Sequence, residues 1–293
     1  MKVAINNGMY KMIRIKKVSL WLLLAVLLSG CSFRFVYNHL DWWTNWYLDD
    51  YVELNEQQQK LFDDEFEKLH LWHRRSQLPK YSEQLKALKL EINSRIDEPQ
   101  IIQHLGALVQ HWQNFLIEAE PKIQPLAYSL SLEQRQQLIK VLAENNQERL
   151  DDYEQLSDDA WYKNKAKEQQ EQLKEWFGKL TKDQKAQVAI MSQDFKRSFE
   201  PWIEYRQQWT SQFADLLNGE LPEHQFKFDF YRLFVNGRSL RSDEFNVLTA
   251  HNNQVFARIF VYIVTSANDK QRKRINKKLN KVISDLDYLA KDD

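Results

Sequence analysis

Apolar residues recur every three or four positions along most of the chain, which is the spacing of one face of an α-helix. No stretch of useful length alternates apolar and polar residues as a strand would. Gly and Pro number only six each, which favours long helices over a fold with many turns. The pattern predicts an all-α, multi-helix bundle of about nine helices. These lie near 56–76, 79–95, 98–119, 131–155, 159–177, 182–217, 222–235, 243–265 and 268–290.

Several of these helices begin with one signature. The segments 54–58, 130–134 and 180–184 all read Leu-cap-x-x-Gln, with Asn, Ser or Thr as the cap, and 97–100 reads Asp-Glu-Pro-Gln. The cap side chain can accept a bond from the exposed N–H groups, and the glutamine can reach back to the cap, which predicts capping boxes. The spacing of the three Leu motifs is irregular, so it excludes a regular solenoid.

The prolines predict where helices begin and break. Pro79 and Pro222 suit the first turn of a helix, where the missing N–H costs nothing. Pro121 and Pro125 are expected to break the chain between two helices. Pro201 lies inside a long periodic stretch, so a kink or a break is expected there.

The first 30 residues have the pattern of an export signal. Residues 1–17 carry five basic residues and no acid, and 18–28 form a nearly unbroken apolar run. This run of about 11 residues is too short to span a membrane, which needs roughly 20. The sequence therefore predicts a signal peptide over 1–30.

The end of the signal, Leu28-Ser29-Gly30-Cys31, resembles the lipobox of bacterial lipoprotein precursors. The resemblance implies cleavage between Gly30 and Cys31 and attachment of acyl chains, such as palmitate, to Cys31. Several acyl chains make a stable membrane anchor. Ser32 follows the cysteine instead of the aspartate associated with inner-membrane retention, so the resemblance favours the periplasmic face of a Gram-negative outer membrane. The other interpretation is a cleaved signal with an incidental cysteine.

Composition changes the picture in two ways. Loss of 1–30 removes five of the 41 basic residues and none of the 41 acidic ones, leaving a net charge of −5 and no charge-based case for nucleic-acid binding. Cys31 is the only cysteine, so its acylation would leave no thiol for a disulfide or a thiolate metal site. No phosphate loop or serine elbow occurs, and the sequence predicts no cofactor.

Three segments follow from these observations. Residues 1–30 are the signal peptide, 31–53 the lipidated N-terminus with an aromatic tether helix, and 54–293 a helical domain with a weak sub-boundary near 218–222. The tether helix is dense in Trp and Tyr, which favour the membrane interface. Its other face is acidic, so we expect it to pack on the domain rather than lie on anionic headgroups.

Two clusters are candidate sites. Asp63, Glu67, His70 and His73 fall on one helix face, next to Arg74, and contain a Glu-x-x-His pair of the kind that di-metal bundles use. A second such pair is absent, so metal binding is weakly supported. Trp72, His73 and Arg74 with Tyr81 form a polar–aromatic cluster at an expected helix–helix corner. This cluster could bind an anionic or peptide ligand, or tie the two helices together by stacking of Arg on Trp.

The predicted helix 268–290 is basic and amphipathic. Seven Lys and Arg residues lie between 270 and 281, opposite a stripe of apolar side chains. The basic face could contact anionic lipid or an acidic partner, pair with the acidic helix 56–67, or be solvated while the stripe joins the core.

The mature N-terminal third resembles an uncharacterised family of proteobacterial lipoproteins, a domain of unknown function. The resemblance rests on Tyr37-Asn38-x-Leu40-Asp41-Trp42-Trp43, Asp50-Tyr51-Val52, Leu54, Gln57-Gln58, Trp72-His73-Arg74 and Leu78-Pro79-x-Tyr81. It implies a helical, lipid-anchored envelope protein and no known activity. A weaker resemblance is to the Spy-type periplasmic chaperones, whose Leu-Thr-x-x-Gln motif matches 180–184.

Two functions are therefore expected to compete. The leading hypothesis is a non-enzymatic binding, scaffolding or chaperone-like lipoprotein that acts on an envelope protein or a client polypeptide. The alternative is a helical enzyme or ligand-binding protein with its site around Asp63, Glu67, His70, His73 and Arg74.

Overall fold

The computed structural model describes residues 31–153 and 155–291, and every regular element in these ranges is a helix. The all-α prediction is thus confirmed. The α-helices are α2 (Cys31–Asn38), α3 (Leu40–Asp49), α4 (Glu56–Trp72), α5 (Leu78–Asn93), α6 (Glu98–Ser129), α7 (Leu132–Asp151), α8 (Asp158–Phe177), α9 (Lys182–Met191), α10 (Phe199–Asn218), α11 (Glu223–Val235), α12 (Asp243–Thr265) and α13 (Asp269–Leu289). A π-helix, His73–Gln77, joins α4 to α5, and short 3₁₀ turns cover Ser192–Asp194 and Gly237–Leu240.

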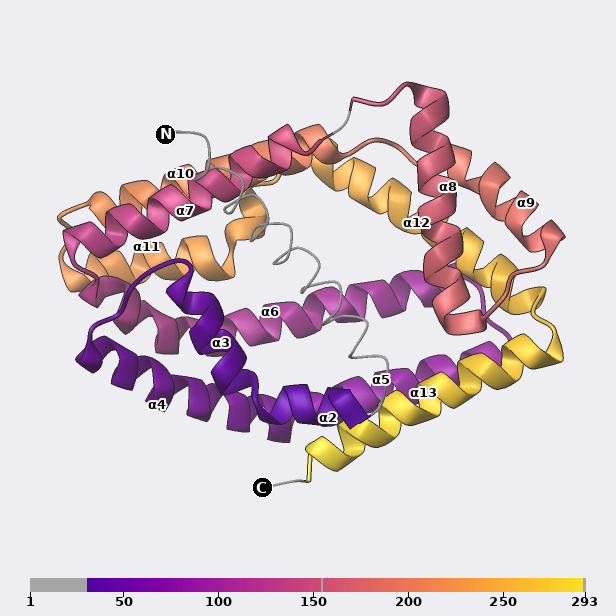
Figure 1. Cartoon of the computed structure of the whole chain (residues 1–293), viewed down its shortest axis with the longest axis horizontal. Coiled ribbons are helices and arrows are strands. Elements are labelled where there is room, and N and C mark those ends of the chain that lie inside the picture. Colours follow the sequence, from indigo (N-terminus) through magenta and orange to yellow (C-terminus); the bar gives the residue numbers. More distant parts are fainter. Residues whose placement is uncertain (1–30, 154, 292–293) are drawn as a thin grey trace, which may run out of the picture.

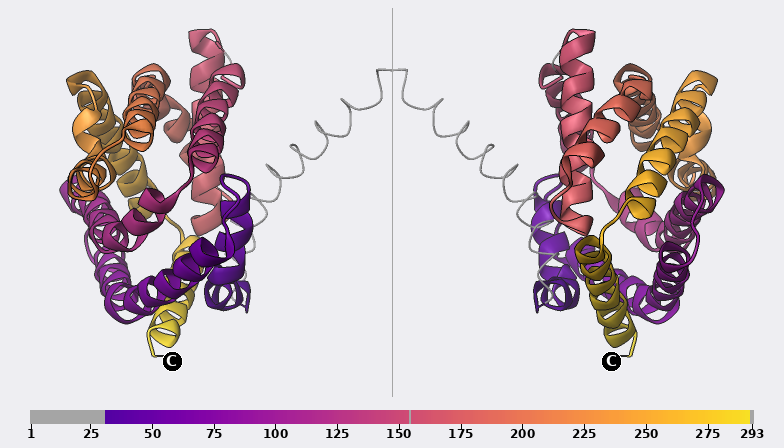
Figure 2. Two further views of the ribbon diagram at one scale, coloured as in Figure 1. Left: turned by 90° about the vertical axis from the view of Figure 1, so that its left-hand side faces the viewer. Right: turned by 90° about the vertical axis from the view of Figure 1, so that its right-hand side faces the viewer.

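In the view of Figure 1 the helices of the bundle follow an oval outline. One end is formed by α7, α10 and α11, the other by α8, α9 and α13, and α6 and α12 run between them. Seen from the side, the helices form two arms that splay apart (Figure 2). Separate apolar cores fill the two ends: one joins α5, α8, α12 and α13, and the other joins α6, α10 and α11.

The expected break at Pro121 and Pro125 is wrong, because α6 continues through both prolines to Ser129. Each proline removes one backbone bond from the helix ladder. The same stretch is packed against α4 and α11, and Ala119 and Ala127 are buried there. Burial of this apolar face offsets the lost bonds, so tertiary packing overrides the local signal.

The expected corner before Pro79 is also absent. The chain passes from α4 into α5 through the π-helix, in which the N–H of Leu78 donates to the carbonyl of His73. A π-turn widens the ladder by one residue, which accommodates the missing N–H of Pro79 without a reversal of the chain. The break expected near Pro201 occurs earlier, at 192–198, and Pro201 then falls in the first turn of α10.

All four expected capping boxes form, and a fifth is present at Asn268 and Gln271. Four of the five boxes do more than cap, because their glutamines bond to one another in pairs. Gln184 and Gln271 exchange two amide hydrogen bonds of 3.1 and 2.8 Å between the starts of α9 and α13. Gln184 also donates to the carbonyl of Ser266, and Gln271 to that of Lys179.

The same arrangement recurs between α4 and α7. Gln58 and Gln134 exchange amide bonds of 3.0 and 2.7 Å, and they also donate to the carbonyls of Ser129 and Glu53 respectively. In both pairs each accepting carbonyl lies two residues before a helix cap. We call each bonded pair a glutamine clasp. One clasp joins the starts of α4 and α7, and the other joins the starts of α9 and α13.

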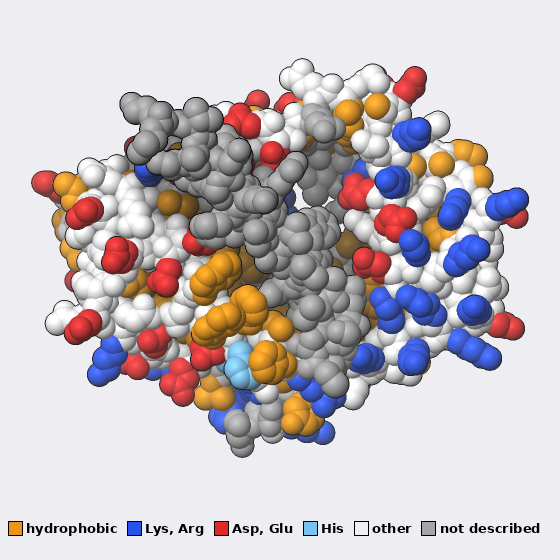
Figure 3. Space-filling model, viewed as in Figure 1, with side chains coloured by type: hydrophobic (Ala, Val, Ile, Leu, Met, Phe, Trp, Pro, Cys, Tyr) orange, Lys and Arg blue, Asp and Glu red, His pale blue; other side chains and the backbone are white. Residues whose placement is uncertain are grey.

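The aromatic N-terminal segment forms two helices instead of the single tether helix expected. α2 packs on the domain: Tyr37 is buried against Leu78 and Leu289, and Arg34 pairs with the buried Asp285 at 2.6 Å. No residue of α3 is buried, and Trp42 is 60% exposed. The exposed aromatic side chains of α2 and α3 form an apolar patch near the centre of the face in Figure 3. We call this patch, made of Phe35, Trp42, Trp46 and Tyr47, the aromatic ledge.

The predicted signal peptide, 1–30, lies outside the described residues, and so does its cleavage position; of Cys31 only the backbone is described. Among the helices that are described, none combines the length and hydrophobicity that a membrane span needs. The stripe of α13 lies in the core, as Ile275 and Leu279 are buried, while α13 packs mainly on α5 and not on the acidic helix α4. The domain division at 31–53 and 54–293, with its sub-boundary, stays a prediction.

The buried clasp should contribute more to stability than an ordinary capping box. Gln184 and Gln271 are only 1% and 2% exposed. Replacement Gln184→Ala removes both exchanged bonds, the bond to the Ser266 carbonyl and the bond from the Thr181 N–H, and it leaves the buried Gln271 amide with fewer partners. We expect it to lower the free energy of unfolding by about 2–4 kcal/mol. Denaturant unfolding followed by circular dichroism measures this.

The matched control is Gln100→Ala, which removes a capping box at the start of α6 for which no paired glutamine contact occurs in the described structure. We expect a loss of only about 0.5–1 kcal/mol there. Equal losses for the two variants would contradict a special role for the clasp.

Candidate functional site

A deep apolar cavity lies between α5, α6, α8, α12 and α13, with a volume of about 840 Å³. This volume falls in the range of small-molecule sites, roughly 300–1,000 Å³. Its walls are aliphatic and aromatic side chains from all five helices. They are Tyr81, Leu85, Leu88 and Ile92 of α5; Ile101, Leu105, Leu108, Trp112 and Phe115 of α6; Leu173, Trp176 and Phe177 of α8; Phe256 and Phe260 of α12; and Ile275, Leu279 and Leu286 of α13.

The cavity is open to solvent on the α6 side. Leu108 and Trp112 belong to its lining and are 57% and 56% exposed. Exposed apolar side chains gain free energy when an apolar ligand covers them and removes them from water. The mouth is therefore suited to admit an apolar group.

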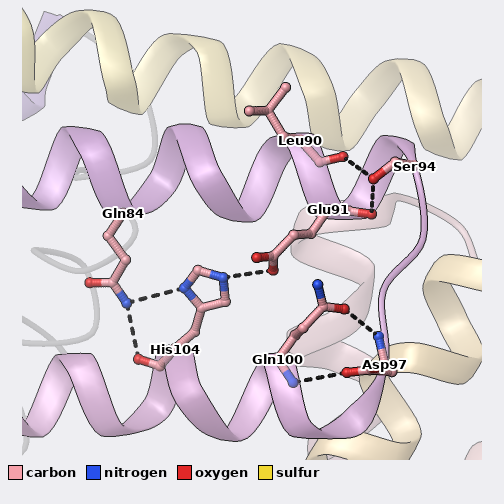
Figure 4. A network of polar contacts seen from close by, with 7 residues as sticks. All are labelled: Gln84, Leu90, Glu91, Ser94, Asp97, Gln100 and His104. Atoms are coloured by element: carbon pink, nitrogen blue, oxygen red, sulfur yellow. Dashed lines mark hydrogen bonds and ion pairs between the residues drawn. The ribbon is translucent and has the colours of Figure 1, made fainter.

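A ladder of polar side chains bridges α5 and α6 along one wall (Figure 4). Gln84 donates to the carbonyl of His104 at 3.0 Å, and His104 Nε2 donates to the Glu91 carboxylate at 2.9 Å. On the other side of Gln84, its Oε1 accepts a bond of 2.7 Å from His111 Nε2. These hydrogen bonds leave one ring nitrogen of these side chains without a partner.

That atom is Nδ1 of His111, which is buried and has no hydrogen-bond partner among the described residues. Because Gln84 Nε2 donates to a carbonyl, its Oε1 must face His111, so His111 Nε2 carries the proton. Burial, with a smaller contribution from the charge of Lys80, lowers the pKa of His111 and keeps its ring neutral. Nδ1 then presents a lone pair and can only accept.

A second polar group lies at the same end of the cavity. His73 Nδ1 lies 2.8 Å from the Tyr37 hydroxyl, and His73 Nε2 lies 3.2 Å from the Tyr81 hydroxyl. The Tyr81 ring contacts the ring of His111 edge-on at 4.6 Å. Burial, then the nearby His70, lowers the pKa of His73 to about 4, and burial raises that of Tyr81. The side chains of His73 and Tyr81 are therefore uncharged at pH 7.

The structure divides the predicted cluster of Trp72, His73, Arg74 and Tyr81. His73 and Tyr81 line the cavity, whereas Trp72 and Arg74 do not. Arg74 instead donates to Asn38 of α2 at 2.8 Å and to the carbonyl of Leu289 in α13 at 3.3 Å, and its guanidinium lies over the Tyr37 ring. Arg74 thus joins α2, the π-helix and α13.

The residues of the alternative site are placed in different surroundings. Asp63 accepts bonds from Asn45 and Gln59 and joins α3 to α4, while Glu67 is exposed. His70 stacks with Phe66 and lies against Tyr37. Burial, then the charge of Arg74, lowers the pKa of His70. Within 31–153 and 155–291, no three His, Cys, Asp or Glu side chains come together as a metal site would require.

The sequence analysis missed Gln84, Glu91, His104 and His111 because they come from two different helices. A signal was present: Gln84 and Glu91 are seven residues apart, and so are His104 and His111. Two helical turns separate the members of each pair, so each pair shares a face. If the two consecutive helices are taken as antiparallel neighbours, the face with Gln84 and Glu91 can be paired with the face that carries His104 and His111.

The sequence matches a family of unknown function, DUF6279, over residues 50–246, about two thirds of the chain. The chain belongs to this family. The expectation of an uncharacterised family is confirmed, while the resemblance to Spy-type chaperones stays a prediction. No curated protein matches the chain, and no solved structure does. The part shared with DUF6279 covers α5, α6 and α8, which form three walls of the cavity.

The neutral His73 should make the stability of this DUF6279 protein depend on pH. Its pKa is about 4 when folded and about 6.5 when exposed, so the unfolded chain binds the proton more tightly. The contribution is fully present above about pH 6.5 and is lost as pH falls towards 4. Allowing for partial solvent screening, the loss is on the order of 2 kcal/mol.

Urea unfolding of His73→Gln, compared at neutral and acidic pH, checks this contribution. Gln keeps a donor and an acceptor but does not titrate, so the loss of stability between about pH 6.5 and 4.5 should shrink. The control His224→Gln changes an exposed histidine outside the cavity. An unchanged acid dependence in His73→Gln would show that His73 is not responsible.

Proposed function

We propose that this protein is a lipid-anchored, non-enzymatic binding module of the bacterial envelope that holds an apolar ligand in the cavity of α5, α6, α8, α12 and α13. The observation that carries the proposal is the cavity itself. An open, mostly apolar space of about 840 Å³ with a few convergent polar groups is the usual form of a small-molecule site. The apolar side chains of the lining can contact an apolar ligand, and its few polar side chains can form hydrogen bonds with that ligand.

The N-terminus supports the envelope part of the proposal. The lipobox-like sequence ends at Cys31, and α2 begins there and packs on the domain through Tyr37 and Arg34. A lipid on Cys31 would therefore hold the domain close to the bilayer with almost no linker. On the resemblance to lipoprotein sorting, the proposed location is the periplasmic face of the outer membrane of a Gram-negative bacterium.

The aromatic ledge favours contact with an envelope protein partner or a client polypeptide as part of the same role. Phe35, Trp42, Trp46 and Tyr47 expose large rings on the segment that follows Cys31. Exposed aromatic side chains are enriched at protein interfaces. The ledge would place such a partner next to the anchor, and the binding module would then act as a scaffold or in a chaperone-like way.

The ligand proposal is tested with N-phenyl-1-naphthylamine, an uncharged apolar probe that fluoresces in dry surroundings. We expect saturable binding of one probe per protein. The variant Leu108→Asp places a charge at the mouth and should weaken binding about tenfold or more, because the carboxylate must be desolvated when the probe enters. Leu88→Trp, which fills the cavity, should weaken binding as well.

Leu90→Asp is the matched control, because Leu90 is exposed on α5 and is directed away from α6 (Figure 4). It should leave probe binding unchanged. Circular dichroism of each variant establishes that it is folded. Equal binding by Leu108→Asp, Leu88→Trp and Leu90→Asp would show that the probe does not use the cavity, and would overturn the ligand proposal.

The anchor is tested separately by the intact mass of the protein isolated from membranes. We expect a mature mass that begins at Cys31 and includes acyl chains. The variant Cys31→Ala should leave the membrane fraction, since it lacks the nucleophile that carries the lipid. A mass with an unmodified cysteine would contradict the anchor but would leave cavity binding open to its own test.

A further inference from the structure

The outer face of α13 is basic and stays exposed in the folded protein. We infer that this face contacts a surface of anionic phospholipids and holds the domain against it. The side chains concerned, which we call the basic strip, are Lys270, Lys273, Arg274, Lys277 and Lys281. The proposed anchor places the domain at a membrane, while the contact of the strip with lipid can be tested without that anchor.

The basic strip lies opposite the buried stripe of the same helix. All five of its side chains are exposed, whereas Ile275 and Leu279 are buried. At 3.6 residues per turn, the strip covers about 100° of the helix circumference, on the side away from these two residues. α13 packs on α5 and α8 rather than on α4, so the acidic side chains of α4 do not cover the strip.

The charges of the strip are not neutralised within the described residues, where none of the five forms an ion pair. Two acids of the neighbouring helices have other partners, because Asp287 pairs with Lys86 and Glu171 pairs with Lys174. Asp269 stands one turn before Lys273 and forms no ion pair with it.

Glu175 of α8 is an acid whose charge reaches α13, where it acts on Lys278. Burial, then the charge of Arg274, lowers the pKa of Lys278, and Glu175 opposes this shift with a smaller effect. Positive charge thus outweighs negative charge even beside Glu175.

The placement of the strip is unfavourable for an isolated helix. Lys273, Lys277 and Lys281 follow one another at intervals of one turn, where like charges repel. Lys270 and Lys273 lie in the first two turns, near the positive end of the helix dipole, and the last turn carries no basic residue. A layer of negative headgroups opposite the strip would offset both costs.

The basic strip belongs to a larger separation of charge (Figure 3). Lys and Arg side chains gather over α8, α9 and α13, on the right of this view, whereas Asp and Glu prevail on the left. The exposed Lys179 and Lys182, in the loop before α9 and at its start, extend the positive region. This distribution turns the α13 end towards an anionic surface, although acids outnumber bases after residue 30.

The position of α2 favours a lipid surface over an acidic protein. Arg34 of α2, one turn after Cys31, pairs with Asp285, and Asp285 lies one turn after Lys281 in α13. The strip therefore begins about 6 Å along the helix axis from the residue that holds α2, and it ends about 22 Å away. A lipid on Cys31 would bring the strip to the same bilayer, where each Lys or Arg near anionic headgroups strengthens binding.

The test is sedimentation with vesicles of phosphatidylcholine, either alone or mixed with phosphatidylglycerol. It uses the chain from residue 31 onward with Cys31→Ser, which contains every core described above and carries no lipid. We expect binding at least about tenfold tighter to the anionic vesicles, and weaker binding in high salt, because salt screens exposed charges. Equal binding to both kinds of vesicle, or none to either, would overturn the lipid contact.

A triple variant removes three charges from the strip: Lys273→Gln, Lys277→Gln and Lys281→Gln. All three side chains are exposed, so the fold should be kept, which circular dichroism checks. We expect the affinity for the anionic vesicles to fall about fivefold for each lysine removed.

The matched control removes the same charge from exposed lysines of α4, α7 and α11: Lys60→Gln, Lys140→Gln and Lys227→Gln. It should keep the affinity of the parent chain for the anionic vesicles. Equal losses in the two triple variants would show that net charge alone governs binding, and would contradict a contact through the strip.

Polyglutamate serves as the competing anionic partner. If it binds the parent chain more tightly than the anionic vesicles do, and the strip variant loses that binding, the partner is an acidic polypeptide and the lipid contact is wrong. These measurements involve neither the acyl chains nor the cavity. Their failure would therefore leave the anchor and the apolar ligand of the proposed function to their own tests.

Discussion

The two glutamine clasps are the constraint on which the rest of the architecture depends. Each clasp joins two helix starts that are far apart in sequence, and each glutamine satisfies a cap, its partner and a carbonyl at once. Because Gln184 and Gln271 are buried, neither can turn away without leaving polar groups unpaired. The clasp therefore fixes the start of α13 against the loop between α8 and α9, and both α8 and α13 form walls of the cavity. The equivalent clasp at Gln58 and Gln134 fixes the opposite end of the oval.

The cavity follows from how α5 and α6 are joined. These consecutive helices are bridged by Gln84, Glu91 and His104 (Figure 4). A further bond joins Gln84 to His111. Below this ladder the walls are apolar, and the five helices leave a space where a core would normally be filled to high density. Such a space forfeits packing energy, which a bound apolar ligand would restore. His73 and Tyr81 place uncharged polar groups at one end of this space.

Much of the fold could be predicted from the sequence, because local signals and tertiary packing agree over most of the chain. The predicted helix 243–265 matches α12, and the capping boxes at 55, 97, 131 and 181 form as expected. Two predicted breaks did not occur. At Pro121 tertiary packing keeps the helix continuous, and before Pro79 a π-helix accommodates the missing N–H. The site was harder. His73 and Tyr81 were chosen for their local cluster, whereas the ladder and the pairing of glutamines depend on which helices become neighbours, and no local pattern specifies that.

Tryptophan quenching by a brominated alkyl compound tests the central claim, an apolar ligand inside the cavity, most directly. Trp112 and Trp176 line the cavity, and no other tryptophan in the described part of the chain does. A tetradecanol brominated along its chain should quench a substantial part of the fluorescence, and the double variant Trp112→Phe, Trp176→Phe should lose that quenching. Quenching that persists in the double variant would place the chain elsewhere, for example on the aromatic ledge, and would contradict the account.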